Sequence, residues 1–263
     1  MDMELRAVKE DESKRFLTAC EAAFGEDLPD DEWADFKHVL EIDRTIAAFD
    51  GDSIVGTAGA FSFRLTVPGG AEVPAAGVTV VGVLPSHRRR GLATKMMRRQ
   101  LDDVRATGEP VAILWASEGS IYQRFGYGLA SLGLHIDVLR TKTRFLNDPG
   151  PSGAVRLVAP IENIETLSAI YDRVRLERPG MVARSEKWWR HHTLPDPERH
   201  RDGGGHSSAG SSSSTPRRAP TRSTGCTTSG KPALPKVMST SRNWSPQVRP
   251  PNARCGVSSS TSI

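Results

Sequence analysis

The stretch "VTVVGVLPSHRRRGLATKM" runs from Val78 to Met96 and decides the fold. Its apolar first half predicts a strand, Pro85 interrupts strand pairing, and the residues after Gly91 predict a helix. Backbone amides at a helix start are unpaired and lie at the positive end of the helix dipole. A phosphate can accept several of these hydrogen bonds, and Arg88–Arg90 add positive charge beside them. The stretch therefore indicates either an anion site or a solvated basic turn.

The end of the predicted strand offers a second kind of contact. Backbone groups of Val81 to Val83 can pair with an extended ligand that contains amides, as in strand addition. The glycine spacing matches neither the Walker pattern nor the dinucleotide-binding pattern. Nothing else in residues 1–200 reinforces a nucleic-acid-binding patch, so we expect no nucleic-acid partner.

The chain of 263 residues changes character near residue 200. Residues 201–263 contain nine Lys or Arg residues but one acidic residue, and they include 15 serines. The sequence pI of about 9.1 therefore reflects this segment, whereas residues 1–200 are net acidic. Such a composition predicts disorder, because it cannot bury enough apolar surface. It fits either a frameshifted reading of a GC-rich gene or a natural basic tail.

Cysteine usage and hydropathy restrict the class of protein. Cys20 is the one cysteine upstream of residue 201, so no internal disulfide is expected there, and no metal-ligand spacing occurs. The sequence shows no signal peptide and no apolar run of about 18 residues. We expect a cytoplasmic protein with no metal and no membrane partner.

The apolar periodicity predicts an α+β fold with a mixed, mostly antiparallel sheet flanked by helices. Expected strands cover residues 3–8, 44–50, 54–68, 75–85, 111–117 and 130–140, and expected helices cover residues 11–25, 30–40, 92–108 and 120–126. After a linker at residue 150, a further strand and helix are expected at residues 154–177. The predicted organisation is a domain at 1–149, the truncated start of a second α/β unit at 154–200, and a disordered tail at 201–263.

A family resemblance rests on two motifs. The pattern R-x-x-G-x-A, formed by Arg88, Gly91 and Ala93, resembles the acetyl-CoA pyrophosphate loop of the GNAT N-acetyltransferases. Together with "RLTVPGG" and "ASEGSIYQRFGYG", it resembles the Eis (enhanced intracellular survival) family over roughly residues 1–195. The resemblance implies a GNAT-like fold, and it implies that residues 154–200 begin a second GNAT-like unit.

The resemblance also implies site residues. The acetyl-CoA contacts would come from one strand, the following loop and helix start, and the end of the next strand: Val81, Gly82, Val83, Arg89, Arg90, Gly91, Leu92, Ala93, Thr94, Ser117 and Glu118. Tyr122 matches the position of the family's general acid. A phenol with a pKa of about 10 can protonate a departing thiolate of comparable pKa. The alternative interpretation is that Tyr122 is a core aromatic residue, and Tyr127 is interpreted as a packing residue.

The general base is not identified by the sequence. The strand that ends at Pro85 contains no acidic residue, and His87 is interpreted as a surface or capping residue. In the Eis family the terminal carboxylate accepts the proton, but the resemblance ends near residue 195, so this role is not transferred. Trp188 and Trp189 are interpreted as core aromatics rather than as a ligand-stacking pair.

Two classes of function follow. The first is an acetyl-CoA-dependent N-acetyltransferase that acts on primary amines, which the resemblance implies are aminoglycoside or lysine amines. The alternative is a catalytically impaired module that binds acyl-CoA, because the C-terminal half of the family pattern is missing. The family is implied to form homo-oligomers, but contacts of missing domains cannot be assumed for this chain.

Overall fold

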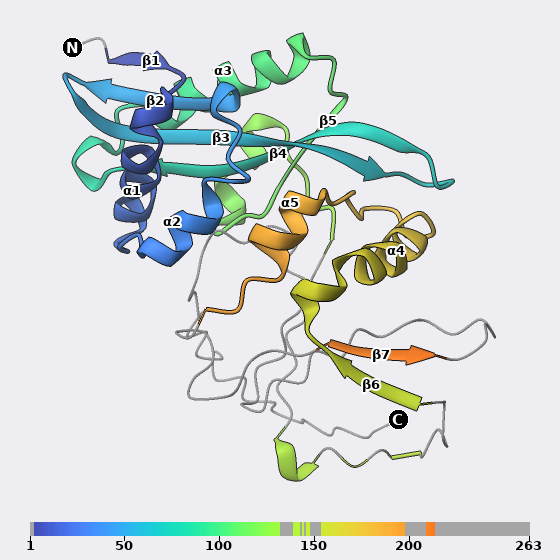
Figure 1. Cartoon of the computed structure of the whole chain (residues 1–263). Coiled ribbons are helices and arrows are strands. Elements are labelled where there is room, and N and C mark those ends of the chain that lie inside the picture. The colour runs from blue at the N-terminus through green and yellow to red at the C-terminus, as the bar shows by residue number, and fades with distance from the viewer. Residues whose placement is uncertain are drawn as a thin grey trace, which may run out of the picture.

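The structure is a computed structural model that describes residues 3–131, 139–142, 144, 146–147, 154–197 and 209–213. Its centre is a five-stranded sheet with strand order β1-β2-β3-β4-β5 (Figure 1). Strands β1 to β4 pair antiparallel, and β5 pairs parallel to β4. The strands are β1 (Glu4–Arg6), β2 (Thr45–Asp50), β3 (Ser53–Thr66), β4 (Glu72–Val83) and β5 (Val111–Leu114). This confirms the predicted α+β class with a mixed, mostly antiparallel sheet.

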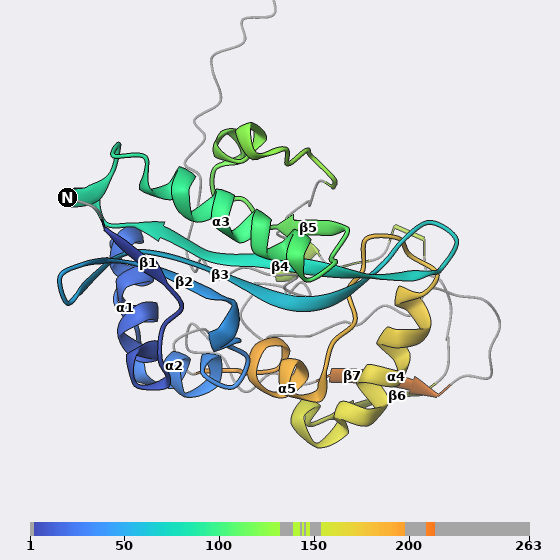
Figure 2. The ribbon, with the colours of Figure 1, turned by 90° about the horizontal axis from the view of Figure 1, so that it is seen from above.

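Helices cover both faces of this sheet. Helices α1 (Ser13–Phe24) and α2 (Asp30–Phe36) lie on one face, and α3 (Leu92–Ala106) lies on the other (Figure 2). Helix α1 ends at Gly25, whose φ of 78° is the left-handed conformation that a glycine C-cap allows. Helix α3 connects the parallel strands β4 and β5, as a parallel pair requires.

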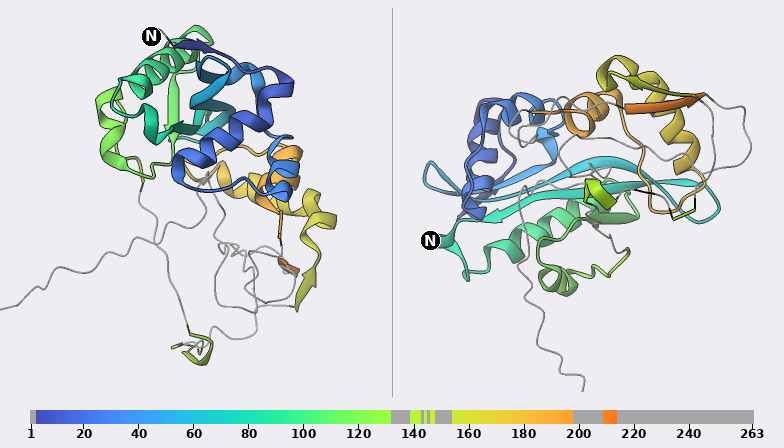
Figure 3. Two further views of the ribbon diagram at one scale, coloured as in Figure 1. Left: turned by 90° about the vertical axis from the view of Figure 1, so that its left-hand side faces the viewer. Right: turned by 90° about the horizontal axis from the view of Figure 1, so that it is seen from below.

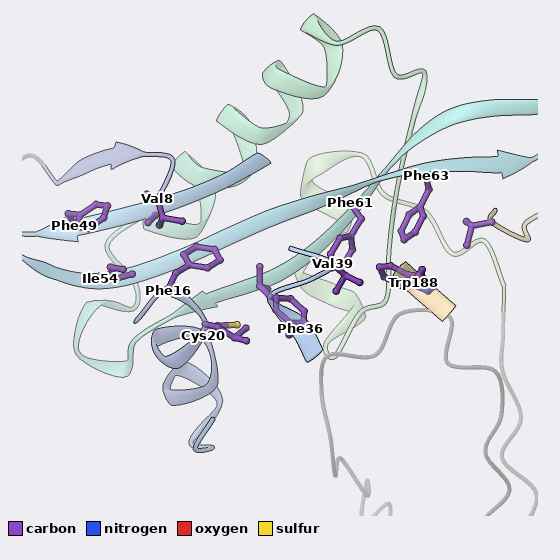
Figure 4. Close-up of a cluster of buried hydrophobic side chains, with 14 residues drawn as sticks. Val8, Phe16, Cys20, Phe36, Val39, Phe49, Ile54, Phe61, Phe63 and Trp188 are labelled. Atoms are coloured by element: carbon purple, nitrogen blue, oxygen red, sulfur yellow. The ribbon is translucent and has the colours of Figure 1, made fainter. Parts of the chain in front are cut away.

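The larger core lies between the sheet and α1. Phe16 and Cys20 of α1 face the sheet, and Phe61 and Phe63 project from β3 toward Trp188 (Figure 4). The Trp188 ring lies 4.8 Å from the Phe61 ring and 5.0 Å from the Phe63 ring, in both cases edge to face. Such aromatic pairs stabilise a core beyond the area they bury.

The C-terminal elements return to this same face. Helix α4 (Ile164–Arg175) and the short α5 (Glu186–Trp188) lie on the side of α1 and α2, opposite α3 (Figure 3). The segment before α5 pairs with the outer end of β3: the Thr66 amide donates to Met181 O at 2.9 Å, and the Ala183 amide donates to Arg64 O at 2.8 Å.

This packing places part of residues 154–200 in the core of the first sheet. Val182 and Trp188 belong to the cluster beneath α1. Trp188 and Trp189 are each 6% exposed, which confirms their interpretation as core aromatics. The boundary at residues 149–154 therefore does not separate two independent sets of core side chains.

A pair of histidines joins α2 to the π-helical turn Trp189–Thr193. The rings of His38 and His191 stack with centroids 4.2 Å apart. His191 Nδ1 lies 3.0 Å from Asp35 Oδ1 of α2. These contacts link the C-terminal segment to the N-terminal helices.

The predictions for residues 130–140 and 201–263 lie mostly outside the described residues. Within the predicted tail, Ala209–Ser213 form strand β7, which pairs antiparallel with β6 (Ala154–Val158). Strand pairing through backbone groups does not depend on apolar side chains, so a Ser- and Gly-rich segment can form it. In the described ranges, no helix has both the length and the apolar character to cross a membrane.

Candidate active site

Strand β4 is interrupted by a β-bulge. Thr57 of β3 pairs with Gly82, whereas Gly59 pairs with Thr79, so two residues of β4 oppose one residue of β3. The first of these two residues, Val80, has a φ of 46°. This is the left-handed region, which a β-branched residue rarely adopts, and the bulge turns the rest of β4 away from its earlier course.

Beyond the bulge, β4 loses its partner on one side. Parallel pairing with β5 begins at Ala75 and Val111 and ends where Val78 pairs with Leu114. Pairing with β3 continues as far as Val83. In the part of the chain that the structure describes, the β5-facing edge of residues 79–83 therefore has no strand partner. This edge includes Val81 to Val83, the residues predicted to pair with an extended ligand.

The turn that follows presents a row of amides. Arg89 and Gly91 both adopt left-handed φ angles, of 61° and 76°, before α3 begins at Leu92. The Lys95 amide makes the first helical hydrogen bond, to Gly91 O at 3.0 Å. Among the described residues, the amides of Arg89 to Thr94 have no acceptor. Six successive donors at a helix start suit an anionic group.

The three arginines of the turn differ in role. Arg88 Nη2 donates to Ala23 O at 2.6 Å, and its Nε donates to Val83 O at 3.2 Å. Arg88 therefore fastens the turn to α1 and to the end of β4. Arg89 and Arg90 are exposed, and neither has an ion-pair partner in the described ranges. The positive charge that the turn presents to solvent thus comes from these two residues.

His87 is engaged away from the turn's amides. Its Nε2 lies 3.1 Å from Asp50 Oδ2, and its Nδ1 lies 2.9 Å from Ser86 Oγ. These contacts occupy both ring nitrogens of His87, whose side chain is 14% exposed. No group of three or more His, Cys, Asp or Glu side chains in the described part of the chain could hold a metal ion.

Helix α1 packs closely behind the bulged strand. A Cβ atom on Gly82 would lie 3.0 Å from Ala23 Cβ and 3.3 Å from Thr57 Oγ1. Only glycine fits this approach without displacement of α1 or β3. The C-terminal end of α1 is thereby held against the strand end and the arginine turn.

Tyr122 follows β5, between two 3-10 turns rather than on the predicted short helix. The turns are Gly119–Ile121 and Gln123–Phe125. The Tyr122 ring packs edge to face on the Tyr127 ring, with centroids 6.0 Å apart. Burial, together with the nearby Cys20 thiol, raises the pKa of Tyr122 above its ordinary value of 10. The phenol therefore stays protonated at neutral pH.

Tyr127 and Cys20 are more strongly affected by burial. Burial raises the pKa of Tyr127 to about 12, and its hydroxyl has no hydrogen-bond partner among the described residues. Burial likewise raises the pKa of Cys20 to about 12, so this thiol is not a nucleophile. Ser117 and Glu118 are exposed and lie three and four residues after the end of β5.

The structure thus brings the predicted strand and turn residues to one end of β4. Ser117 and Glu118 lie beyond the end of β5. Tyr122 lies near enough to Cys20 of α1 for the thiol to affect its pKa. Sequence reasoning missed the bulge at Val80 and the hydroxyl of Thr57 beside it. The available signal was Gly82, a glycine within a run of valines, which often marks a bulge or a close backbone approach.

Comparisons with known proteins agree with this geometry. Residues 4–130 match the family described as "Acetyltransferase (GNAT) domain". An uncharacterized N-acetyltransferase of Streptomyces avermitilis is 46% identical over 205 residues, which cover 77% of this chain and 50% of that protein. N-acetyltransferase Eis of Mycobacterium tuberculosis is 43% identical over 143 residues, or 53% of this chain and 36% of that protein.

A solved structure shows the same relationship. Eis1 from Mycobacterium abscessus superimposes with a TM-score of 0.65 at 36% identity, covering 80% of this chain and 51% of that chain. The chain spans about half the length of the Streptomyces avermitilis protein and of Eis1. From the bulged strand, the amide-rich turn and these similarities, we conclude that residues 4–130 of this chain form a GNAT acetyltransferase domain, with Eis proteins among its relatives.

Proposed function

We propose that this chain is an acetyl-CoA-dependent N-acetyltransferase that transfers the acetyl group to primary amines. The observation that carries the proposal is the bulge at Val80. Within the described residues, the edge of residues 79–83 is unpaired directly before a turn whose amides lack acceptors. A thioester substrate with a diphosphate and an amide-containing arm needs both features in this order.

Acetyl-CoA binding is assigned to three groups of residues. The amides of Arg89 to Thr94, with the Arg89 and Arg90 guanidinium groups, bind the diphosphate. Val81, Gly82 and Val83 pair with the pantetheine arm, which fixes the position of the thioester. Ser117 and Glu118, beyond the end of β5, contact the cofactor from the other strand. The open surroundings of Gly91, where a Cβ atom would meet nothing within 4 Å, leave room for the diphosphate.

Acetyl transfer needs one bond formed, one bond broken and two protons moved. The amine nitrogen attacks the thioester carbonyl carbon, the C–S bond then breaks, and the thiolate leaves. Tyr122 donates its phenolic proton to this thiolate, and its raised pKa supports the assignment because the acid must be protonated beforehand. The attacking nitrogen loses its own proton to a base that no residue of this chain is assigned to supply.

The acceptor is proposed to be cationic. Helix α1 ends beside β4, because Ala23 contacts both Arg88 and the Gly82 position. The connection from α1 to α2 that starts there carries Glu26 and Asp27. This acidic segment favours the approach of polyamines such as aminoglycosides or of lysine side chains.

A thiol-release assay tests the proposal. Acetyl-CoA and tobramycin are incubated with the full chain, and free thiol is followed with a chromogenic disulfide reagent. We expect turnover that Tyr122→Phe reduces at least about 100-fold, the size of effect typical for a general acid. Tyr127→Phe is the matched control, because it alters the same turn but should retain activity.

The same assay separates the alternative of a binding module. His87 is engaged by Asp50 and Ser86, and residues 75–83 of β4 carry no acidic side chain. Binding of CoA in calorimetry without thiol release would support a module that holds acyl-CoA but performs no chemistry. Absence of both binding and release would overturn the assignment of the cofactor site.

A further inference from the structure

We propose that Thr57 is a positioning residue that holds the bulge of β4 in the conformation that presents the amides of Val81 to Val83. This inference rests on the proposed function, because the ligand of those amides is acetyl-CoA. It adds a residue on β3, outside the turn and the strand assigned to the cofactor. Thr57 acts through Val80 and does not itself touch the substrate.

A single buried hydrogen bond carries the inference. Thr57 Oγ1 donates to Val80 O at 2.8 Å, and Thr57 and Val80 are 1% and 3% exposed. This bond spans the position where the β3–β4 register shifts. A buried carbonyl that loses its donor is costly, since no water can replace the missing partner. The Thr57 hydroxyl therefore favours the bulged register over a regular one.

Val80 needs such support. Its φ of 46° is unfavourable for a β-branched residue, and such conformations persist only where the surroundings stabilise them. Two interactions provide the stabilisation. The Val80 side chain packs in the core beneath α1, and the Val80 carbonyl accepts a hydrogen bond from the Thr57 hydroxyl. Loss of the hydroxyl leaves the core contact alone to maintain the bulge.

The surroundings also limit what can replace Thr57. Its Oγ1 lies 3.3 Å from the Cβ position of Gly82, and its hydroxyl is a hydrogen-bond neighbour of the Cys20 thiol. A valine at residue 57 has nearly the same shape as threonine but no hydroxyl. A serine retains the hydroxyl and loses one methyl group. The two variants therefore separate the hydrogen bond from the packing.

The experiment compares Thr57→Val with Thr57→Ser in the full chain. The readouts are the dissociation constant of CoA by calorimetry, the KM of acetyl-CoA, the KM of tobramycin, and the thermal midpoint of unfolding. For Thr57→Val we expect CoA binding and the KM of acetyl-CoA to weaken by about tenfold, with the KM of tobramycin unchanged. For Thr57→Ser we expect CoA binding within about threefold of the unmodified chain.

A second variant distinguishes loss of the bulge conformation from general unfolding. Glycine adopts a positive φ without strain, so Val80→Gly should weaken the dependence on Thr57. In the Val80→Gly background, Thr57→Val should then change CoA affinity by less than about threefold. An equal loss in both backgrounds would overturn the inference, as would unchanged CoA affinity in a folded Thr57→Val chain. Failure of the unmodified chain to bind CoA would instead overturn the proposed function and, with it, this inference.

Discussion

Arg88 Nη2 lies 2.6 Å from the carbonyl oxygen of Ala23, so the first arginine of the "HRRRG" run connects the turn to the end of α1. Its Nε also bonds to Val83 O, the last residue of β4. Helix α1, strand β4 and the turn therefore meet at one guanidinium group. Arg89 and Arg90 make no comparable contact within the described residues, although all three arginines are adjacent in sequence.

This difference predicts that substitution of Arg88 lowers stability, whereas substitution of the neighbouring Arg89 weakens CoA binding. Arg88→Ala should lower the free energy of unfolding by about 1 kcal/mol, because it removes two hydrogen bonds from a charged donor at a partly exposed site. Arg89→Ala should change stability by less than about 0.5 kcal/mol but weaken CoA binding, with a smaller salt dependence than the unmodified chain. Urea unfolding and calorimetry at two salt concentrations measure both. Equal stability losses in the two variants would contradict the assignment of roles.

The close approach at Gly82 predicts that even a methyl group is harmful. Gly82→Ala places a Cβ atom 3.0 Å from Ala23 Cβ, so either α1 or β4 must shift. We expect a stability loss of about 1–3 kcal/mol from overpacking, accompanied by weaker CoA binding. Gly128→Ala is the matched control, because its Cβ atom would meet nothing within 4 Å. A Gly82→Ala chain as stable as this control would show that α1 moves without cost.

The raised pKa of Tyr122 predicts the shape of the pH profile. Amine acceptors are mostly protonated at neutral pH, so the rate should rise with pH as the free amine accumulates. Tyr122 must stay protonated, and burial keeps its pKa above 10. The rate with tobramycin should therefore show no descending limb between pH 6 and about pH 9.5. A decline that begins below about pH 9 would argue against Tyr122 as the acid.

The stacked histidines predict acid sensitivity of the C-terminal segment. Partial desolvation of the exposed His38 ring, together with the adjacent His191, lowers the pKa of His38 below its ordinary value of 6.5. The unfolded chain then binds a proton more readily than the folded chain, so stability falls as the pH decreases below about 6.5. Urea midpoints at pH 7.5 and 5.5 measure this loss, and His38→Gln should reduce it. The Glu12 carboxylate does not interfere, because its pKa is lowered to about 2 by Arg6.

The sequence predicted the order of elements and the amide-rich turn because both depend on local patterns. Alternating and helical apolar spacing defines the elements, and the run from Pro85 to Gly91 marks a strand end and a helix start. The bulge at Val80 could not be predicted from such local patterns. Valine disfavours the φ that Val80 adopts, so local preference opposes the observed backbone, and only the Thr57 hydroxyl and the packing of α1 explain it.

The C-terminal segment illustrates the same limit. Residues 154–200 read as the start of a separate unit, because a Pro- and Gly-rich linker precedes them. The sequence indicated that Trp188 is a core residue, but not that it and Val182 would enter the core beneath α1, since this depends on contacts with Phe61 and Phe63 of β3. The sequence pattern likewise did not predict that Arg88 and its two neighbouring arginines have separate roles.

The position of Trp188 has a practical consequence for anyone who trims this chain to its family-matched part. A fragment that stops at residue 131 would remove the Trp188 ring from Phe61 and Phe63, and it would remove the backbone partners that residues 180–183 provide to Arg64 and Thr66. An exposed aromatic surface beside an unpaired strand edge favours self-association. A fragment that extends to residue 197 keeps this cover, and it is the shorter version that should precipitate during purification.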